Sequence, residues 1–110
     1  MLMKSLKLKA SADDLNLAVL VSEPECAPKG VFQIVHGMCE HKERYAAFME
    51  YLSGHGYVCV IHDHRGHGES VKTPDDLGFM YKGGWRAMVE DVKVVADWAK
   101  AHYPGLKHVL

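Results

Sequence analysis

The stretch Val31-Phe32-Gln33-Ile34-Val35-His36-Gly37 decides the fold of this chain. Its first five residues are nearly all apolar, which is typical of a strand buried on both faces in a parallel sheet that helices cover. The run stops at Gly37, which lets the backbone turn without a side-chain clash. After such a turn, backbone N–H groups at the carboxyl end of a strand and near a helix N-terminus can hold an anion. We therefore expect a functional site at this turn.

A helix and a second buried strand follow the turn. One helical face is apolar at the i, i+3, i+4 and i+7 positions, which are Tyr45, Phe48, Met49 and Leu52. The helix is predicted to end near Gly54-His55-Gly56. The next run, Tyr57-Val58-Cys59-Val60-Ile61, is again apolar, so strand, helix and strand form a predicted parallel unit. This arrangement places the turns at His36 and His62 at the same edge of the sheet.

The segment before Val31 predicts an antiparallel hairpin at a sheet edge. Apolar side chains alternate with polar ones on both sides of a turn at Asp13-Asp14. Such alternation is typical of strands with one apolar and one hydrated face. The alternating apolar residues are Leu6, Leu8, Ala10, Leu15, Leu17, Val19 and Val21.

The segment after Ile61 predicts a long loop, a helix and the opening of another strand. Residues 64–84 are rich in glycine and predict a loop with a short helical turn after Thr73-Pro74. A longer helix is predicted from Trp85 to a stop at Pro104-Gly105, with Trp85 and Trp98 in packing roles. Lys107-His108-Val109-Leu110 is typical of the start of a buried strand. The predicted apolar stripe of the helix consists of Met88, Val89, Val92, Val95, Ala96, Ala99 and His102, whereas Glu90, Asp91, Lys93, Asp97 and Lys100 lie outside it.

Composition excludes several classes of protein. The chain has 110 residues and a formal net charge of -1, so it fits one domain, and its scattered basic residues form no nucleic-acid-binding face. Cys26, Cys39 and Cys59 match neither a disulfide framework nor a zinc ribbon, which favours a reducing compartment. No signal-peptide pattern or apolar run of membrane-spanning length is present in the sequence. We expect a cytoplasmic protein.

Three closely spaced imidazoles suggest one kind of site. His62, His64 and His67 follow the second buried strand, and their H-x-H-x-x-H spacing resembles the metal motif of metallo-β-lactamase-like hydrolases. Neutral imidazoles are good zinc ligands. However, Gly66 stands where that family has an aspartate that supplies the second metal's ligand or the base. A zinc-binding hydrolase is therefore the weaker alternative.

Two motifs together indicate another family. The first is His36-Gly37-Met38-Cys39-Glu40-His41 with Arg44-Tyr45, and the second is Asp63-His64-Arg65-Gly66-His67-Gly68-Glu69-Ser70. They resemble the patterns H-G-x-x-E-H-x-x-R-Y and D-x-R-G-H-G-x-S of the α/β-hydrolase branch that contains monoacylglycerol lipases and lysophospholipases. The resemblance covers nearly the whole chain. It implies the N-terminal part of an α/β-hydrolase fold, with an antiparallel edge hairpin followed by parallel strands flanked by helices.

The resemblance also implies roles for single residues. The backbone N–H of Met38 supplies half of an oxyanion hole, His36 and Gly37 shape its turn, and His36 and Met38 bind substrate. Cys39 beside it is expected to be a small packed side chain rather than a reactive thiol. Ser70 lacks the strand-to-helix turn of a nucleophile. The residues expected to shape the two loops are Glu40, His41, Arg44, Asp63, Arg65, Gly66 and Gly68. For Glu40 alone, a simple preference for the helix N-terminus is an equally good interpretation.

The sequence departs from the family pattern in one important respect. No G-x-S-x-G occurs in the 110 residues, and in the resembled family this motif follows the strand that opens here at Lys107. We therefore expect residues 1–110 to be the N-terminal portion of a single α/β-hydrolase domain, ending before the nucleophile elbow and inactive alone.

The parent enzyme would cleave a small-molecule or lipid ester through an acyl-enzyme, without metal or cofactor. An open strand edge invites self-association or pairing with a missing C-terminal part. A non-catalytic assembly domain stays open as a further interpretation.

Overall fold

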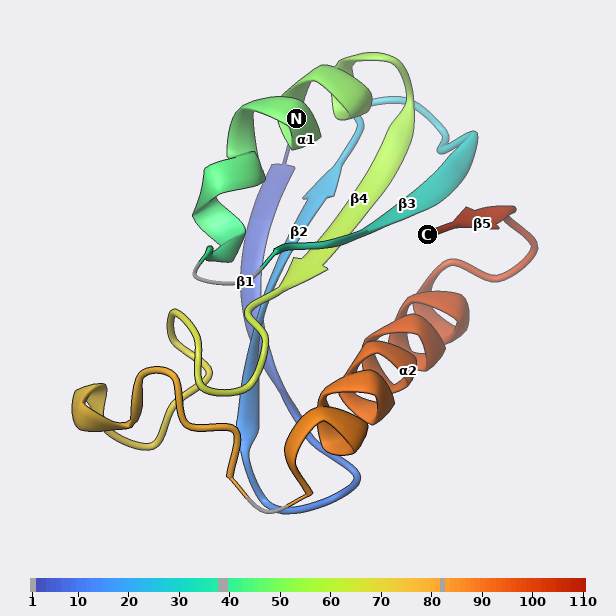
Figure 1. Cartoon of the computed structure of the whole chain (residues 1–110). Coiled ribbons are helices and arrows are strands. Elements are labelled where there is room, and N and C mark those ends of the chain that lie inside the picture. The colour runs from blue at the N-terminus through green and yellow to red at the C-terminus, as the bar shows by residue number, and fades with distance from the viewer. Residues whose placement is uncertain (1, 38–39, 82) are drawn as a thin grey trace.

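A computed structural model describes residues 2–37, 40–81 and 83–110 and shows one mixed sheet between two helices (Figure 1). The strands stand in the order β1-β2-β4-β3-β5. Their bounds are β1 Leu2–Lys9, β2 Asn16–Glu23, β3 Gly30–Val35, β4 Tyr57–His62 and β5 His108–Val109. The helices are α1 Ala46–Gly54 and α2 Gly84–His102, with the 3-10 helices η1 Lys42–Tyr45 and η2 Pro74–Asp76. No helix among the described residues is long and apolar enough to cross a membrane.

The predicted hairpin is confirmed. β1 and β2 pair antiparallel from Leu2 opposite Glu23 to Lys9 opposite Asn16, and β1 is an edge strand. β2 also pairs antiparallel with β4, so it lies inside the sheet. Its side chains are therefore buried on both faces, including Ala18 and Leu20, which the alternating pattern assigned to a hydrated face.

The predicted parallel unit is confirmed as well. β3 and β4 run parallel from Gly30 opposite Tyr57 to Val35 opposite His62. β5 pairs parallel with the other side of β3, His108 lying opposite Val31. The segment at Lys107 therefore does open a strand, and β3 lies between β4 and β5.

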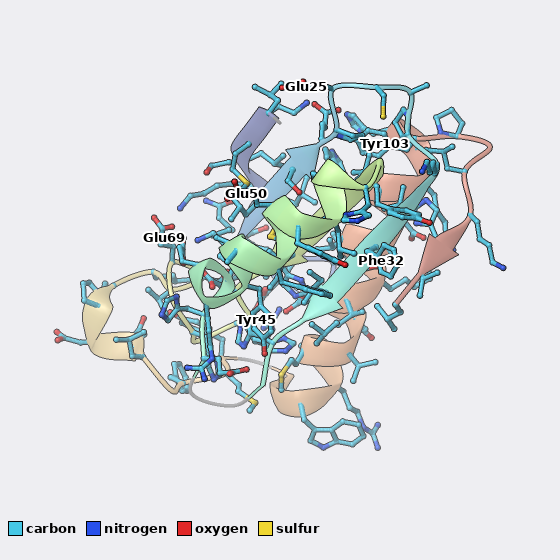
Figure 2. All side chains as sticks on the ribbon, turned by 90° about the horizontal axis from the view of Figure 1, so that it is seen from above. Glu25, Phe32, Tyr45, Glu50, Glu69 and Tyr103 are labelled. Atoms are coloured by element: carbon cyan, nitrogen blue, oxygen red, sulfur yellow. The ribbon has the colours of Figure 1, made fainter. Side chains whose placement is uncertain are left out.

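Each face of the sheet has its own core. On one face Val31, Val58 and Val60 pack against Val95 and Ala99 of α2. On the other face, Cys59 and Ile61 pack with Met49 and Leu52 of α1, which confirms Cys59 as a core residue. Phe32 and Tyr45, both labelled in Figure 2, pack against this second core.

The helical stripes were predicted only in part. Val89 and Trp85 are 61% and 63% exposed, so their predicted packing roles are wrong. Phe48 is 50% exposed because α1 packs on β4 and β2, leaving this ring beside an open pocket of about 600 Å³ along β3. Asp91, placed outside the stripe of α2, is fully buried, since it forms an ion pair with Arg65 inside the fold.

Candidate functional site

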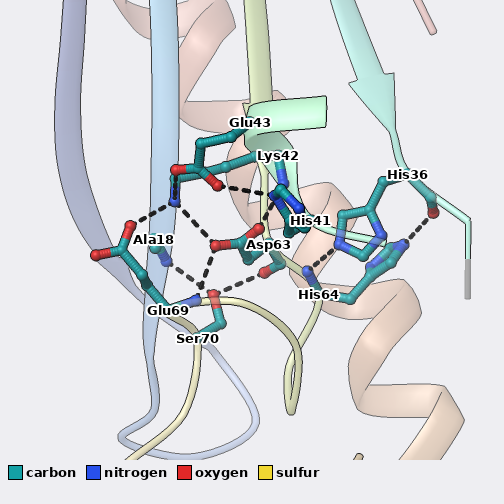
Figure 3. Close-up of polar contacts among 9 residues, drawn as sticks. All are labelled: Ala18, His36, His41, Lys42, Glu43, Asp63, His64, Glu69 and Ser70. Carbon is teal, nitrogen blue, oxygen red and sulfur yellow. Dashed lines mark hydrogen bonds and ion pairs between the residues drawn. The ribbon is translucent and has the colours of Figure 1, made fainter. Parts of the chain in front are cut away.

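The carboxyl ends of β3 and β4 bring two histidines into contact, at one edge of the sheet as the sequence predicted (Figure 3). The backbone N–H of His64 donates to Nε2 of His36 at 2.9 Å. Nε2 of His64 in turn donates to the carbonyl oxygen of His36 at 3.0 Å. Nδ1 of His36 donates to the carbonyl oxygen of Gly37 at 2.7 Å. These bonds join the two loops that carry the sequence motifs.

A tight turn follows His36. The backbone N–H of Gly37 donates to Oε1 of Glu40 at 2.6 Å, and the backbone N–H of Glu40 donates back to the Gly37 carbonyl at 3.3 Å. Tyr45 and Arg44 hold the same carboxylate, at 2.8 Å each. The Tyr45 hydroxyl and the Gly37 N–H lower the pKa of Glu40 below its ordinary value. The carboxylate of Glu40 thus closes the turn.

The first motif also contains Met38, Cys39 and His41. Met38, the predicted oxyanion donor, and Cys39 lie outside the described residues. His41 is exposed, and its Nδ1 lies 3.2 Å from Oε1 of Glu43. Among the described residues the His41 side chain hydrogen-bonds to Glu43 and not to the turn at Gly37, so its loop-shaping role stays a prediction.

Asp63 connects the two loops from a fully buried position (Figure 3). Its Oδ1 accepts the backbone N–H of Lys42 at 2.6 Å, and its Oδ2 accepts the Lys42 ammonium and the backbone N–H of Glu69, both at 2.9 Å. Burial alone would raise the pKa of Asp63, but these hydrogen bonds hold it below its ordinary value. Asp63 therefore remains a carboxylate that ties η1 to the loop after β4.

Lys42 is a site residue that the sequence reasoning missed. Its side chain is 2% exposed, and Nζ lies 2.9 Å from Asp63 and 2.7 Å from both Glu43 and Glu69. Burial opposes the charge, yet the three carboxylates raise the pKa of Lys42 above its ordinary value. Lys42 occupies a variable position of the motif, so only its acidic neighbours in space could have identified it.

Arg65 connects the second loop to two distant elements. Its guanidinium is fully buried and forms two hydrogen bonds with Asp91 of α2, at 2.7 and 3.0 Å. It also reaches Asp13 in the hairpin turn at 2.9 Å and the carbonyl oxygen of Met80 at 3.2 Å. Hydrogen bonding to Arg65 lowers the pKa of Asp13.

Two glycines turn the second loop where a side chain would not fit. Gly66 and Gly68 have φ angles of 75° and 49°, in the left-handed region. A Cβ at Gly66 would overlap the carbonyl group of Phe79, and one at Gly68 would overlap the carboxylate of Asp63. The loop can pass this closely only because both residues lack side chains.

Ser70 has a structural position. It is fully buried, and its Oγ accepts the backbone N–H of Ala18 at 2.9 Å and donates to the carbonyl oxygen of Asp63 at 2.7 Å. With both hydrogen-bonding functions used inside the fold, the hydroxyl is not presented to a substrate. The sequence correctly set it apart from a nucleophile.

The three imidazoles of the zinc alternative lie near one another but form no metal-ligand set among the described residues. Ring centroids lie 5.3 Å apart for His62 and His64 and 6.1 Å apart for His64 and His67. Nδ1 of His67 donates to the carbonyl oxygen of Arg65 at 3.1 Å. Within residues 2–37, 40–81 and 83–110, no group of three or more His, Cys, Asp or Glu side chains is placed to hold a metal ion. The spacing in sequence is therefore not matched by a ligand set in space.

His62 is the most secluded of these imidazoles. It is fully buried, and neither ring nitrogen has a hydrogen-bond partner among the described residues. Burial, together with His64 and His36, lowers the pKa of His62 to about 3. The ring is neutral over the physiological range.

A pocket lies between the two motif loops. It has a volume of about 600 Å³ and is lined by residues 40–41, 43, 66–68 and 77–78. The turn at Gly37 borders it through Glu40. A small molecule could therefore reach the loops that the two motifs build.

Comparisons with known proteins agree with this arrangement. A family model described as serine aminopeptidase S33 matches residues 26–110. Human monoglyceride lipase is 31% identical over 96 residues, which are 87% of this chain and 30% of that protein. Monoacylglycerol lipase of Mycolicibacterium smegmatis is 38% identical over 87 residues, which are 79% of this chain and 29% of that protein. The chain therefore spans less than a third of the length of these curated relatives.

Solved structures show the same fold. The crystal structure of a thermostable carboxyl esterase from Bacillus coagulans, in complex with glycerol, aligns with a TM-score of 0.88 and 27% identity over 98% of this chain and 35% of that one. A cold-adapted esterase from an Arctic intertidal metagenomic library aligns with a TM-score of 0.75 and 21% identity. The alignment covers 96% of this chain and 47% of the esterase chain. The predicted α/β-hydrolase fold is thus confirmed, and the chain belongs to the serine aminopeptidase S33 family of α/β-hydrolases.

Proposed function

We propose that this chain is the N-terminal segment of a serine hydrolase that cleaves carboxylic esters through an acyl-enzyme. The observation that carries the proposal is the turn at the carboxyl end of β3, which Glu40 closes through the Gly37 N–H. Such a turn can present a backbone donor to the oxygen that becomes negative when an ester carbonyl is attacked. The ester chemistry of the named relatives supports the same assignment.

In this proposal the backbone N–H of Met38 is half of the oxyanion hole. Gly37 forms the turn, and His36 and Met38 border the reacting carbonyl. One such donor stabilises a tetrahedral intermediate by about 3 kcal/mol. The segment contributes this stabilisation and the loops around it, without metal or cofactor.

The remaining catalytic groups come from outside these residues in the proposed enzyme. A serine attacks the ester carbonyl, the alcohol leaves with a proton delivered by a histidine, and water then hydrolyses the acyl-serine. The acid that orients the histidine completes the triad. No G-x-S-x-G motif is present in the 110 residues, so we propose that the chain alone does not turn over esters.

The substrates we propose are acylglycerols or lysophospholipids. The names of the two lipases support the first class, and the second follows from the resemblance of the two motifs. We further propose that the chain pairs with a C-terminal part or with itself. We also propose that it acts in the cytoplasm, because the pattern of its cysteines favours a reducing compartment.

The test is the mass of the native polypeptide in its source, measured together with labelling by a fluorophosphonate probe. We expect a mass well above 12.3 kDa and one labelled serine, and hydrolysis of a p-nitrophenyl ester by that protein. The purified 110-residue chain should give background hydrolysis only. Robust turnover by that chain, or an unlabelled native protein, would contradict the proposal.

A matched pair of variants tests the turn itself. A Cβ at Gly37 would meet Oε1 of Glu40 at 2.9 Å, so Gly37→Ala displaces the carboxylate that closes the turn. We expect kcat of the native enzyme to fall about tenfold or more, since misplaced oxyanion donors cost rate. Gly54→Ala at the end of α1, where a Cβ meets no described atom within 4 Å, is the control and should leave kcat unchanged.

A further inference from the structure

His64 stands at a position that the family motifs leave variable, yet it makes two hydrogen bonds to His36. Its backbone N–H donates to Nε2 of His36 at 2.9 Å, and its Nε2 donates to the His36 carbonyl oxygen at 3.0 Å. The two rings pack edge to face with centroids 4.3 Å apart. His64 is 7% exposed and His36 is 3% exposed, so water does not compete for these bonds.

The bonds define which nitrogens carry protons. Nε2 of His36 accepts a backbone N–H, so the proton of this neutral ring is on Nδ1, which donates to the Gly37 carbonyl oxygen at 2.7 Å. Nε2 of His64 donates, so its Nδ1 is the unprotonated nitrogen. Burial and the neighbouring His36 lower the pKa of His64, which keeps this ring neutral. Two imidazole N–H groups thus hold the carbonyl oxygens of His36 and Gly37.

We propose that His64 is a positioning residue for the oxyanion donor after Gly37 and acts through His36. This inference rests on the proposed function. A trans peptide group is planar, and its N–H points opposite to its C=O. Because His36 holds the Gly37 carbonyl, we infer that it also orients the donor that the proposed function places after Gly37.

The two hydrogen bonds of His64 act on different parts of His36. The backbone N–H selects the tautomer of His36, and without it Nδ1 of His36 need not carry a proton. The side-chain N–H holds the His36 carbonyl, which fixes the peptide group before Gly37. The carbonyl oxygens of His36 and Gly37 are then both held before substrate arrives, and pre-oriented donors are the ones that accelerate a reaction.

Substitutions of His64 in the native enzyme test the proposal. His64→Leu removes the side-chain donor, and we expect kcat to fall about tenfold or more with KM unchanged, as for a lost transition-state interaction. The affinity for a boronic acid, whose tetrahedral adduct places an oxygen in the hole, should fall by the same factor. His64→Gln retains an N–H near the place of Nε2 and should restore most of both losses.

The controls separate positioning from folding. His55→Gln removes an exposed imidazole that hydrogen-bonds to the Tyr51 carbonyl near the opposite end of the sheet, and it should change neither kcat nor boronic acid affinity. Thermal unfolding of each variant shows whether it is folded at the assay temperature. If His64→Leu keeps full kcat, or if a folded His64→Gln is as slow as His64→Leu, the proposal is wrong.

The outcomes also distinguish this inference from the proposed function. If the native protein carries no serine that a fluorophosphonate labels, the proposed function fails. If it is labelled and hydrolyses esters, but the kcat and boronic acid affinity of folded His64 variants equal those of the wild type, the oxyanion turn does not depend on His64 and only this inference fails.

Discussion

Arg65 and Asp91 form a fully buried ion pair across 26 residues of sequence, with Nε and Oδ2 2.7 Å apart. A second hydrogen bond of 3.0 Å makes the contact bidentate. Burial raises the pKa of Asp91, and the bonds from Arg65 oppose this rise. The pair joins the loop after β4 to α2, so the loop depends on a helix that is remote in sequence.

Asp91→Asn should destabilise the protein strongly. The substitution keeps the shape of the side chain but removes the carboxylate that pairs bidentately with the buried guanidinium, so we expect the free energy of unfolding to fall by about 3 kcal/mol. Urea unfolding measures the change. Asp97→Asn, which removes an exposed carboxylate paired with Lys93 on the same helix, is the control and should have no measurable effect. Equal effects of the two variants would contradict the importance of the buried pair.

Lys42→Met should weaken the link between η1 and the loop after β4. The ammonium bonds three carboxylates from a buried position, and we expect its loss to lower the free energy of unfolding by about 2 kcal/mol. Asp63 has a lowered pKa in the folded state, so its stabilisation is present above its unfolded value and is lost as pH falls through the folded value.

The difference between wild type and Lys42→Met should therefore shrink below about pH 4. Unfolding measured at several pH values checks this expectation. Lys93→Met, at an exposed ion pair, serves as the control. A difference that stays constant down to about pH 2 would show that Asp63 is not the partner that matters.

His62 should make the protein sensitive to mild acid. Its folded-state pKa is about 3 against an ordinary value of 6.5, so between these values the unfolded chain binds a proton that the folded chain does not. Stability is full above the ordinary value and falls by about 1.4 kcal/mol per pH unit below it from this group alone. The pKa of His64 is lowered too and acts in the same direction, whereas the negative charge of Asp63 opposes the lowering of the His62 pKa.

The measurement is the slope of unfolding free energy against pH between about pH 6 and pH 5. His62→Gln should reduce this slope by about one proton. His55→Gln, which removes an exposed imidazole, is the control variant. An unchanged slope in His62→Gln would mean that the imidazole of His62 is protonated in the folded protein.

Gly66→Ala should destabilise the protein far more than Gly78→Ala. Both glycines have positive φ angles, 75° and 89°, so the backbone strain of the two substitutions is similar. Only at Gly66 would the new Cβ overlap a backbone carbonyl, that of Phe79, whereas a Cβ at Gly78 meets no described atom within 4 Å. Thermal unfolding compares the two, and equal losses would show that φ alone decides.

The purified chain should self-associate through the edge formed by β5 and β3. β5 pairs with β3 only at Val31 and Phe32 among the described residues, and open strand edges pair with other chains. Sedimentation velocity should detect species larger than a monomer. Val109→Lys places a charge on the exposed edge and should lower the fraction of these larger species. Leu2→Lys on the opposite edge strand is the control. A well-behaved wild-type monomer would contradict this prediction.

Two of the strand pairings followed from local patterns in the sequence, whereas the antiparallel pairing of β2 with β4 did not. The apolar runs at β3 and β4 and the amphipathic helix between them predicted a parallel unit, and the alternation in β1 and β2 predicted a hairpin. The glycines at positions 66 and 68 marked bends that the structure contains. The roles given to Met38 and the other site residues remain predictions.

Tertiary structure alone decided which charges are buried and which apolar side chains are exposed. The helical periodicity assigned Asp91 to solvent, because its partner Arg65 lies 26 residues away and no local pattern indicates the pairing. Lys42 is buried for the same reason, since its carboxylate Asp63 comes from another loop. Phe48 is exposed because its helical face extends past the strands that α1 covers. A charged side chain can leave water only when partners compensate its desolvation, and the folded chain brings such partners together from distant elements at Arg65 and Lys42.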